Sequence, residues 1–587
     1  MKKNRSNSKK IKIELPDSII SQIFTKLGLK DLVKTSTLSK LWRNEWKLRT
    51  DLNFDLCNMF DLNKVQELPK SLPLLHGFQS EFVTRLDQFM LHYQGAIVDS
   101  IRVKCPLNYE HSDVIERLIS KGINKGAKRI ELLFSYENND DTCRISTRFG
   151  SGLIPCKFSF DMLSGTDSLT YLHLQNCGLE TPLEFSGLKN LRTLVLQWVD
   201  VWQNRLEGLF SNCIHLVDLT LDDCEFMSDL KIISSTLFRL NITNCRVTVK
   251  RKIDIVASNL PSIEYSCKDG YVHSMNIEAH MLSKFSYRGR KIYKPVGFSG
   301  LKNVTTIVFD GLSDFKHPNI VHLLFSNCVQ LEDVTFKNCE GIYHTNIVSS
   351  KLRHLKIIEC GYFQRIDINA LNLASFEYSG NTRRNISVTA PMLSRVFWNA
   401  AKREKNQHPF GPITTLQHIE NLSMIISTSQ VAKVTEVLVQ YRNLRQLELF
   451  IEGAYEPNMD YFWILDIAMT SQHLQKLSLT IRNLHLENSH MVGFKRQRKE
   501  YAGFSHNDLK YVELRGCVCS SNVIEFASCL LRNAISLKQI TFGSDDEFYI
   551  GAGRWTNGSD GCRWFDRNLI HEKLKDEVHE PCRLIIF

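Results

Sequence analysis

Apolar residues follow one recurring pattern over most of this chain, L-x-x-L-x-L-x-x-N/C. Clear copies run from Leu169 to Cys177, from Leu216 to Cys224 and from Leu237 to Cys245. Other copies end at Cys339, Cys360 and Cys517. Degenerate copies without the cysteine begin at Leu191, Leu282, Val304, Leu373, Leu393, Ile419, Leu444, Leu474 and Leu537, and weaker ones at Val98 and Ala127. The alternation inside each copy predicts a short strand with one apolar face.

The copies mostly follow one another at about 20 to 30 residues, which is the period of leucine-rich repeats. One such unit can bury its apolar face only by stacking on its neighbours. We therefore expect an α/β solenoid with a curved parallel sheet and with helices and turns on the convex side. Amphipathic stretches at 431–439 and 523–531 predict helices there. Shorter repeats are expected to use turns instead.

A longer period lies on top of the repeats. The motif Phe-Ser-Gly-Leu-Lys-Asn at 185–190 returns at 298–303, and Leu-Phe-Ser-Asn-Cys at 209–213 returns at 324–328. The offset is about 113 residues, so we interpret segments 185–287 and 298–398 as a duplicated block of about five repeats.

The N-terminal segment has a different pattern, which predicts three short helices over about residues 14–48. Pro16 suits the first turn of a helix, and Ile19, Ile23 and Leu27 form one apolar stripe. Trp42 and Trp46 share a face of the third helix. A module this small carries more apolar surface than it can cover. It either caps the repeats or docks on a partner, and the pattern alone leaves both interpretations open.

Leu15-Pro-Asp-Ser-Ile-Ile-Ser-Gln-Ile-Phe-Thr-Lys-Leu27, then Lys30-Asp-Leu-Val-Lys-Thr-Ser-Thr-Leu-Ser-Lys-Leu-Trp42 and Trp46, resemble the F-box of plant F-box/leucine-rich-repeat proteins. Leu41 departs from the basic residue usual in that family. Segment 82–92 resembles the helix that follows the F-box, and segment 509–542 partly resembles the FBD region.

This resemblance implies a substrate receptor of an SCF-type (Skp-cullin-F-box) ubiquitin ligase. The F-box would bind a Skp-type adaptor, and through it a cullin and a RING subunit, while the repeats would capture an unknown protein for ubiquitination. By the same resemblance, the candidate adaptor contacts are Leu15, Pro16, Ile19, Ile20, Ile23, Leu27, Val33, Leu38 and Trp42.

The resulting domain organisation has six parts. They are a disordered basic tail at 1–13, the F-box at 14–50, a helical linker at 51–95, leucine-rich repeats at 96–508, FBD-like last repeats at 509–542, and a C-terminal loop and cap at 543–587. Within the last part we expect a helix and then a strand over 569–587.

In each strand, the residues between the inward leucines are candidates for binding the partner. The candidates are Tyr171, His173, Asp218, Asp222, Lys337, His354, Lys356 and Phe450. Their charges could complement a partner, or they could be ordinary solvated residues. A small-molecule co-receptor for a hormone or inositol phosphate is the second reading, and it would need a basic pocket around Lys337, His354 and Lys356. A repeat scaffold without ligase coupling is the third.

Charge and cysteine content change this picture little. The net charge of +10 is modest for 587 residues and forms no basic stripe, so we expect no nucleic-acid partner. No apolar run is long enough to span a bilayer, and the polar, basic N-terminus lacks a signal-peptide core, which predicts a cytoplasmic or nuclear protein. Most of the repeat cysteines share one motif position, so we interpret them as buried structural residues and expect no metal.

Enzyme motifs are missing from the sequence. It has no P-loop, no dinucleotide-binding glycine motif after a strand, no H-E-x-x-H and no G-x-S-x-G. We therefore expect no catalytic residues and no cofactor, with any ubiquitin chemistry carried out by other subunits.

Overall fold

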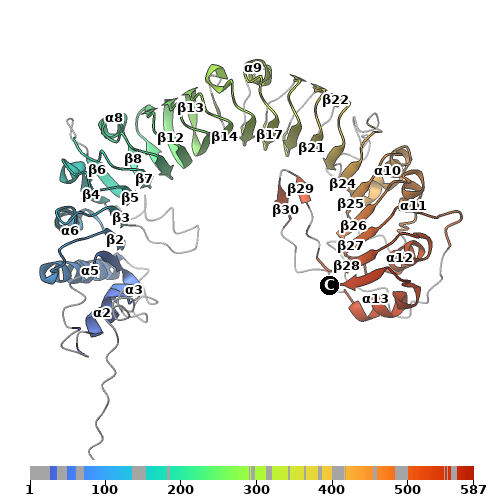
Figure 1. Ribbon diagram of the computed structural model, residues 1–587, viewed down its shortest axis with the longest axis horizontal. Coiled ribbons are helices and arrows are strands. Elements are labelled where there is room, and N and C mark those ends of the chain that lie inside the picture. Colours follow the sequence, from blue (N-terminus) through green and yellow to red (C-terminus); the bar gives the residue numbers. More distant parts are fainter. Residues whose placement is uncertain are drawn as a thin grey trace, which may run out of the picture. The chain divides into compact units, whose positions relative to one another are not determined.

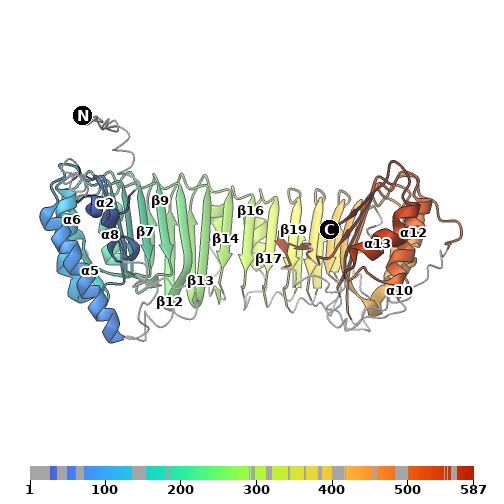
Figure 2. The same ribbon diagram turned by 90° about the horizontal axis from the view of Figure 1, so that it is seen from below.

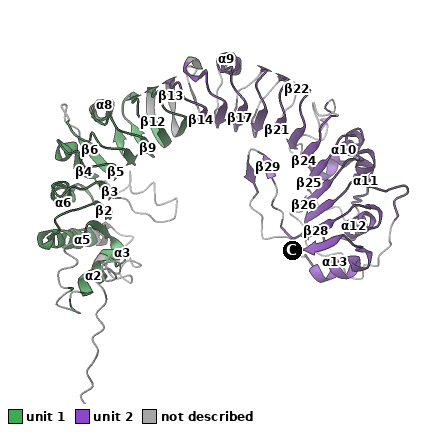
Figure 3. Ribbon diagram, viewed as in Figure 1, with its two compact units in different colours: residues 1–270 green, residues 271–587 purple. Residues whose placement is uncertain are grey.

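The structure is a computed structural model, and it forms two compact units, residues 1–270 and 271–587 (Figure 3). The residues it describes are 27–35, 37, 42, 49–60, 72–134, 154–180, 186–289, 291–292, 298–312, 320–340, 344–361, 365–380, 386–399, 416, 418–453, 459–482, 500–545, 547, 549–551, 553–556 and 565–587. The basic tail expected at 1–13 lies outside them.

The first unit is built on a parallel sheet in which each strand pairs with the strand of the next repeat. Its strands in spatial order are β1 (Asp51–Asp55), β2 (Ser100–Lys104), β3 (Arg129–Leu133), β5 (Tyr171–Gln175), β7 (Thr193–Gln197), β9 (Asp218–Asp222) and the first part of β12 (Arg239–Val256). Smaller strands are β4 (Cys156–Ser159), β6 (Cys177–Glu180), β8 (Asp200–Val201), β10 (Glu225–Phe226) and β11 (Leu230–Ile233).

Strand β1 corrects the sequence-based domain boundaries. We expect a helical linker over 51–95, but residues 51–55 pair with β2 as the first strand of the sheet. Leu52 and Phe54 are fully buried while their neighbours are not, so this short segment has the alternation of a half-buried strand. The remainder of the segment does hold helices, including the long α5 (Leu72–His92).

Helices cover one face of this sheet, and we call the opposite face the open face (Figure 1). The helices of the unit are α2 (Leu29–Thr35), α3 (Leu56–Met59), α5, α6 (Ser112–Ile123) and α8 (Gln203–Asn212). Short 3-10 helices span Tyr109–His111 and Phe160–Leu163. No helix among the described residues is both long and apolar enough to cross a membrane.

The second unit repeats this arrangement with more strands. Strand β13 (Ser262–Glu278) runs across the boundary between the units. The sheet strands that follow are β14 (Lys284–Arg288), β16 (Thr306–Asp310), β17 (Asp333–Lys337), β19 (His354–Ile358), β21 (Ser375–Ser379), β23 (Arg395–Asn399), β24 (Asn421–Ser427), β25 (Gln446–Glu452), β26 (Lys476–Arg482), β27 (Tyr511–Gly516), β28 (Gln539–Gly543) and β31 (Arg583–Ile586). These strands pair in parallel and lie side by side, as Figure 2 shows for β16, β17 and β19.

Helices cover one face of the sheet in this unit too (Figure 1). They are α9 (Ile320–Asn327), α10 (Val431–Leu438), α11 (Trp463–Thr470), α12 (Ser521–Asn533) and α13 (Arg567–Leu574), with short 3-10 helices at Phe298–Leu301, Thr428–Gln430 and Lys575–Glu577. Helix α10 begins at the residue where the sequence predicts a helix, and α12 contains the other predicted stretch. A helix and then a strand are expected over 569–587, and the structure has α13, which begins two residues earlier at Arg567, followed by β31, which pairs with β28.

Short repeats use strands where we expect turns. Strands β18 (His344–Val348), β20 (Arg365–Asn369) and β22 (Ile386–Thr389) form a separate three-stranded parallel sheet. Ile366 and Ile368 of β20 are buried while Arg365 and Asn369 are exposed. These repeats are too short for a helix, so a second strand buries their remaining apolar residues and satisfies the backbone by pairing.

The turn after the main strand has the same backbone in many repeats. The residue just before the motif cysteine has a positive φ, for example 55° at Asn176 and 50° at Asn338. The thiol that follows donates to a carbonyl of the preceding repeat, at 3.3 Å from Cys224 to Leu196 and 3.6 Å from Cys339 to Phe309. These contacts explain why small polar residues and cysteine recur at this point.

Candidate adaptor and partner-binding surfaces

The described part of the N-terminal module centres on helix α2. Of the candidate adaptor contacts, Leu27 and Trp42 are half-buried, and Val33 on α2 is 42% exposed. The other candidates lie outside the described residues, and they are Leu15, Pro16, Ile19, Ile20, Ile23 and Leu38.

Hydrogen bonds attach this module to the start of the repeats. Arg49 donates to the carbonyl of Leu27 at 2.6 Å, and Lys30 donates to the carbonyl of Phe60 at 3.4 Å. The Tyr93 hydroxyl in turn donates to the carbonyl of Arg49 at 2.6 Å. The module therefore packs against the first repeat while α2 still exposes an apolar residue, so capping the repeats and docking on a partner are compatible.

Tyr171 and His173 lie side by side on the open face of the first unit. The Arg129 guanidinium lies over the Tyr171 ring, 3.6 Å from its centroid, and Arg129 also pairs with Glu131 at 2.5 Å. Arg102 lies 3.3 Å from the same carboxylate. Burial lowers the pKa of His173, and this effect exceeds the opposite effect of the Glu131 carboxylate, which raises it. The lowered pKa favours a neutral imidazole at neutral pH.

The acidic candidates connect neighbouring strands. Both carboxylate oxygens of Asp218 accept from Arg239, at 2.6 and 3.0 Å. Asp222 accepts from Gln197 at 3.0 Å and from Thr243 at 2.8 Å. Because these carboxylates are already hydrogen-bonded across the sheet, they stabilise the stacking of repeats in addition to any contact they make with a partner.

The basic candidates of the second unit each face a carboxylate on an adjacent strand. The pairs are Lys337 with Asp310 at 3.3 Å, Lys356 with Glu377 at 3.0 Å and His354 with Asp333 at 3.9 Å. An anionic small molecule bound here would compete with those carboxylates, so nothing in this arrangement favours a hormone or inositol phosphate pocket.

Phe450 belongs to an apolar cluster on the open face of the second unit. It is 2% exposed and packs with Phe397 and Ile425, while Tyr549 and Ile550 cover the cluster. Phe450 is among the residues predicted from sequence to bind a partner, whereas Phe397, Ile425, Tyr549 and Ile550 are not. A detectable signal was present, since Phe397 and Ile425 occupy strand positions that are polar in most other repeats.

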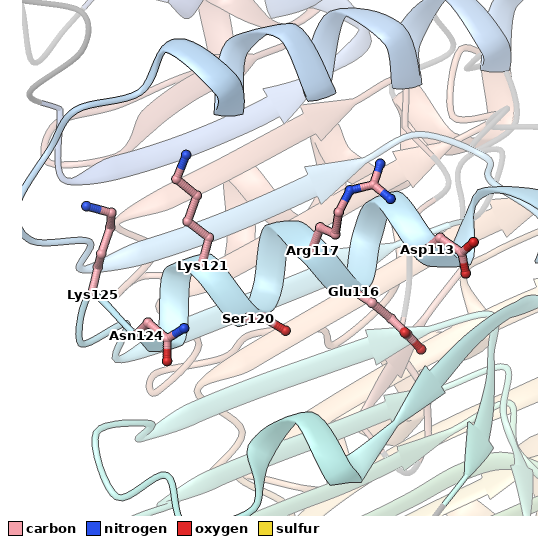
Figure 4. Close-up of a pocket in the computed structure, with 7 residues that line it drawn as sticks. All are labelled: Asp113, Glu116, Arg117, Ser120, Lys121, Asn124 and Lys125. Atoms are coloured by element: carbon pink, nitrogen blue, oxygen red, sulfur yellow. The ribbon is translucent and has the colours of Figure 1, made fainter.

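A shallow hollow along helix α6 is lined by Asp113, Glu116, Arg117, Ser120, Lys121, Asn124 and Lys125 (Figure 4). Its cations already have partners. Arg117 pairs with Asp87 of α5 at 3.2 Å, Lys121 donates to the carbonyl of Met90, and Lys125 donates to the carbonyl of Gly95. These contacts attach α6 to α5 and to the chain after α5. The cations of the hollow therefore serve the packing of these elements.

The described cysteines are free thiols, and most of them are buried. Burial raises the pKa of Cys245 and Cys360 well above the ordinary thiol value, which keeps both protonated and poorly nucleophilic. Within the described ranges, no group of three or more histidines, cysteines or acids could hold a metal ion.

Two family models match the chain. The F-box domain matches residues 13–50, and the At1g61320/AtMIF1 LRR domain matches residues 98–293 and 318–576. Together they cover the N-terminal module and most of the parallel sheet described above.

Several Arabidopsis thaliana proteins are similar in sequence. The FBD-associated F-box protein At1g66310 is 30% identical over 235 residues, which cover 39% of this chain and 45% of the relative. The putative FBD-associated F-box protein At1g61330 is 23% identical over 347 residues, which cover 58% of this chain and 67% of the relative. The F-box/FBD/LRR-repeat protein At1g78750 is 26% identical over 229 residues, which cover 36% and 43%. The chain thus spans less than two thirds of the first and third relatives.

Proposed function

Because this chain belongs to the F-box/leucine-rich-repeat proteins, we propose that it is the substrate-recognition subunit of an SCF-type ubiquitin ligase. Its F-box binds a Skp-type adaptor, and its repeats hold a target protein for ubiquitination by the other subunits. It acts in the cytoplasm or nucleus, as an adaptor without catalysis of its own.

The observation that carries this proposal is the succession of two modules with different surfaces. An F-box match over 13–50 precedes a repeat-domain match that begins at residue 98. Arg49 and Lys30 attach the first module to the first repeat, while Val33 remains 42% exposed. An apolar residue that stays outward on a short, firmly attached helix suits docking on another protein.

The adaptor-binding residues are proposed on the F-box resemblance. They are Leu15, Pro16, Ile19, Ile20, Ile23, Leu27, Val33, Leu38 and Trp42. Apolar side chains of this kind supply most of the binding energy when a helix docks in a groove.

The target is proposed to bind the open face of the repeats. On the first unit, Tyr171 under Arg129 presents an aromatic surface with a cation, and Asp218 adds a carboxylate. On the second unit, Lys337 and Lys356 each pair with a carboxylate. A surface with alternating charges gives specificity for one protein partner more than affinity for a simple ion.

A direct binding measurement tests the adaptor half of the proposal. The purified full-length chain is titrated with a recombinant plant Skp-type adaptor by isothermal titration calorimetry, alongside Leu15→Ala/Pro16→Ala. We expect binding by the native chain and at least ten-fold weaker binding by the double variant, with Lys34→Ala on the exposed side of α2 as a matched control. A native chain that folds but binds no adaptor contradicts the ligase role and supports a repeat scaffold.

A further inference from the structure

The open face of the second unit carries a compact apolar patch. Phe397, Ile425 and Phe450 come from three neighbouring strands, β23, β24 and β25, and are 4%, 2% and 2% exposed. The strand register places Phe397 beside Glu377 of β21, and Ile425 beside Phe450. Large apolar side chains at solvent-facing strand positions are unfavourable unless something covers them.

A hairpin from the C-terminal part of the chain covers this patch. Strands β29 (Tyr549–Gly551) and β30 (Arg554–Trp555) pair in antiparallel fashion, and Figure 1 shows them on the face of the sheet opposite helices α10, α11 and α12. The Tyr549 ring packs edge-on against Phe397, with centroids 5.6 Å apart, and Ile550 packs on the same cluster.

A polar anchor fixes the orientation of Tyr549. Its hydroxyl lies 3.1 Å from both carboxylate oxygens of Glu377, to which it donates. Lys356 holds the same carboxylate at 3.0 Å, and the backbone N–H of Gly553 donates back to the tyrosine oxygen at 2.9 Å. The Glu377 side chain is only 10% exposed, so it is a prearranged and nearly dry acceptor for one hydroxyl donor.

Gly551 of the hairpin also packs closely against the sheet. A Cβ placed on Gly551 would meet Ile358 and Phe397 at 3.0 Å, and its φ of 93° is one that other residues rarely adopt. The patch therefore accepts an aromatic residue with a hydroxyl, an aliphatic residue and then a glycine, in that order. This is the specificity of a peptide-binding site, with an apolar floor and one buried polar contact.

The hairpin has the properties of an exchangeable occupant. Its two strands contain three and two residues, and an isolated hairpin of this size is at best marginally stable in water. Trp555 of its second strand is 63% exposed. Among the described residues, Tyr549, Ile550 and Gly551 lie against the apolar patch of the sheet.

We propose that this patch is the site where the repeats bind their partner, and that the hairpin is an internal ligand that competes for it. The partner is a protein segment that presents a tyrosine followed by an aliphatic residue and a small residue, and it binds by displacing the hairpin. The proposal rests on the function proposed above, that the repeats capture a protein. Tethering gives the hairpin an effective concentration of about millimolar, so a partner must either bind more tightly or meet a chain whose hairpin has been released.

A peptide-binding experiment tests the site. The probe is a fluorescently labelled synthetic peptide of residues 547–556, titrated into the full-length chain and into a variant in which those residues are replaced by a glycine-serine linker of equal length. We expect the linker variant to bind the peptide at least ten-fold more tightly than the native chain does. Phe397→Ala in the linker variant should abolish binding, and peptides carrying Tyr549→Phe or Gly551→Val should bind more weakly.

Other outcomes would overturn the proposal. A folded linker variant that does not bind the peptide would show that the patch is not a peptide-binding site. Equal binding by both proteins would show that the peptide binds outside the patch. If the linker variant fails to fold, full-length Gly551→Val decides the matter, since it retains every apolar residue and releases the hairpin by steric conflict and by an unfavourable backbone conformation at position 551. No gain in peptide binding by that variant would contradict an exchangeable hairpin. None of these results depends on the adaptor, so this test can fail while the ligase role stands.

Discussion

At the scale of single residues, many repeats share one backbone feature in the turn after the main strand. The residue after the strand adopts a positive φ, and an asparagine there also uses its side chain, as when Asn338 donates to Asp310 at 2.8 Å. Asparagine tolerates this backbone better than most residues with a side chain. The buried motif cysteine thus directly follows a position with this backbone requirement, as Cys177 follows Asn176.

Asn338 offers a test of that requirement. Glycine and alanine remove the same hydrogen bond to Asp310, but only alanine is strained at a φ of 50°. We expect Asn338→Ala to be less stable than Asn338→Gly by about 1 kcal/mol, as measured by urea unfolding. Equal stability of the two variants would mean that the backbone conformation carries no strain.

His173 makes the stability of the folded protein depend on pH, and the direction of this dependence can be predicted. Its pKa is lowered by burial in the folded state, so below its ordinary pKa of about 6.5 the unfolded chain binds more protons than the folded chain. Stability is therefore fully present above that pH and falls as the pH drops below it. We expect His173→Gln to lose less stability between pH 7.5 and 5.5 than the native chain, and an unchanged slope would contradict the assignment.

At the scale of elements, the main strands were predictable and several other features were not. Repeats such as the one at Leu169–Cys177 were found because the L-x-L alternation specifies which face is buried. Strands β18, β20 and β22 were missed because only neighbouring repeats decide between a turn and a strand in so short a segment. The Tyr549–Glu377 contact joins positions 172 residues apart, and no local pattern predicts it.

The glycine of the repeated Phe-Ser-Gly-Leu-Lys-Asn motif has a physical reason in both copies. Gly187 and Gly300 occupy the same place in the repeated Phe-Ser-Gly-Leu-Lys-Asn motif. A Cβ on Gly187 would lie 2.4 Å from the carbonyl oxygen of Leu163, and one on Gly300 would lie 1.5 Å from that of Ile277. Both motifs therefore need a glycine so that backbones of successive repeats can approach closely.

Alanine substitution tests this close approach. We expect Gly300→Ala to destabilise the chain by about 1 to 3 kcal/mol, because a backbone carbonyl cannot move aside without disturbing the repeat that carries it. The matched control is Gly361→Ala, whose Cβ would meet only Glu340 at 3.9 Å. Thermal unfolding of the two variants under identical conditions measures the difference. Similar midpoints would show that the Gly300 site can relax.

At the scale of the whole molecule, we propose that the chain separates two tasks. The N-terminal module is anchored by Arg49 and Lys30, and Val33 on its helix α2 is 42% exposed. The repeats present an open face that carries charged pairs and the patch around Phe397 and Phe450, which the hairpin covers and which we propose as the recognition site. The candidate adaptor residues came from motif resemblance alone, since spacing could show only that the module had apolar surface to spare.

Affinity capture from plant cells under proteasome inhibition tests this division of tasks most directly. The tagged native chain and the Leu15→Ala/Pro16→Ala variant are purified in parallel, and the associated proteins are quantified by mass spectrometry. We predict that the variant loses the Skp-type adaptor, cullin and RING subunits while the proteins bound to the repeats remain. Loss of both groups, or of neither, would contradict a chain that uses its F-box for the ligase and its repeats for the target.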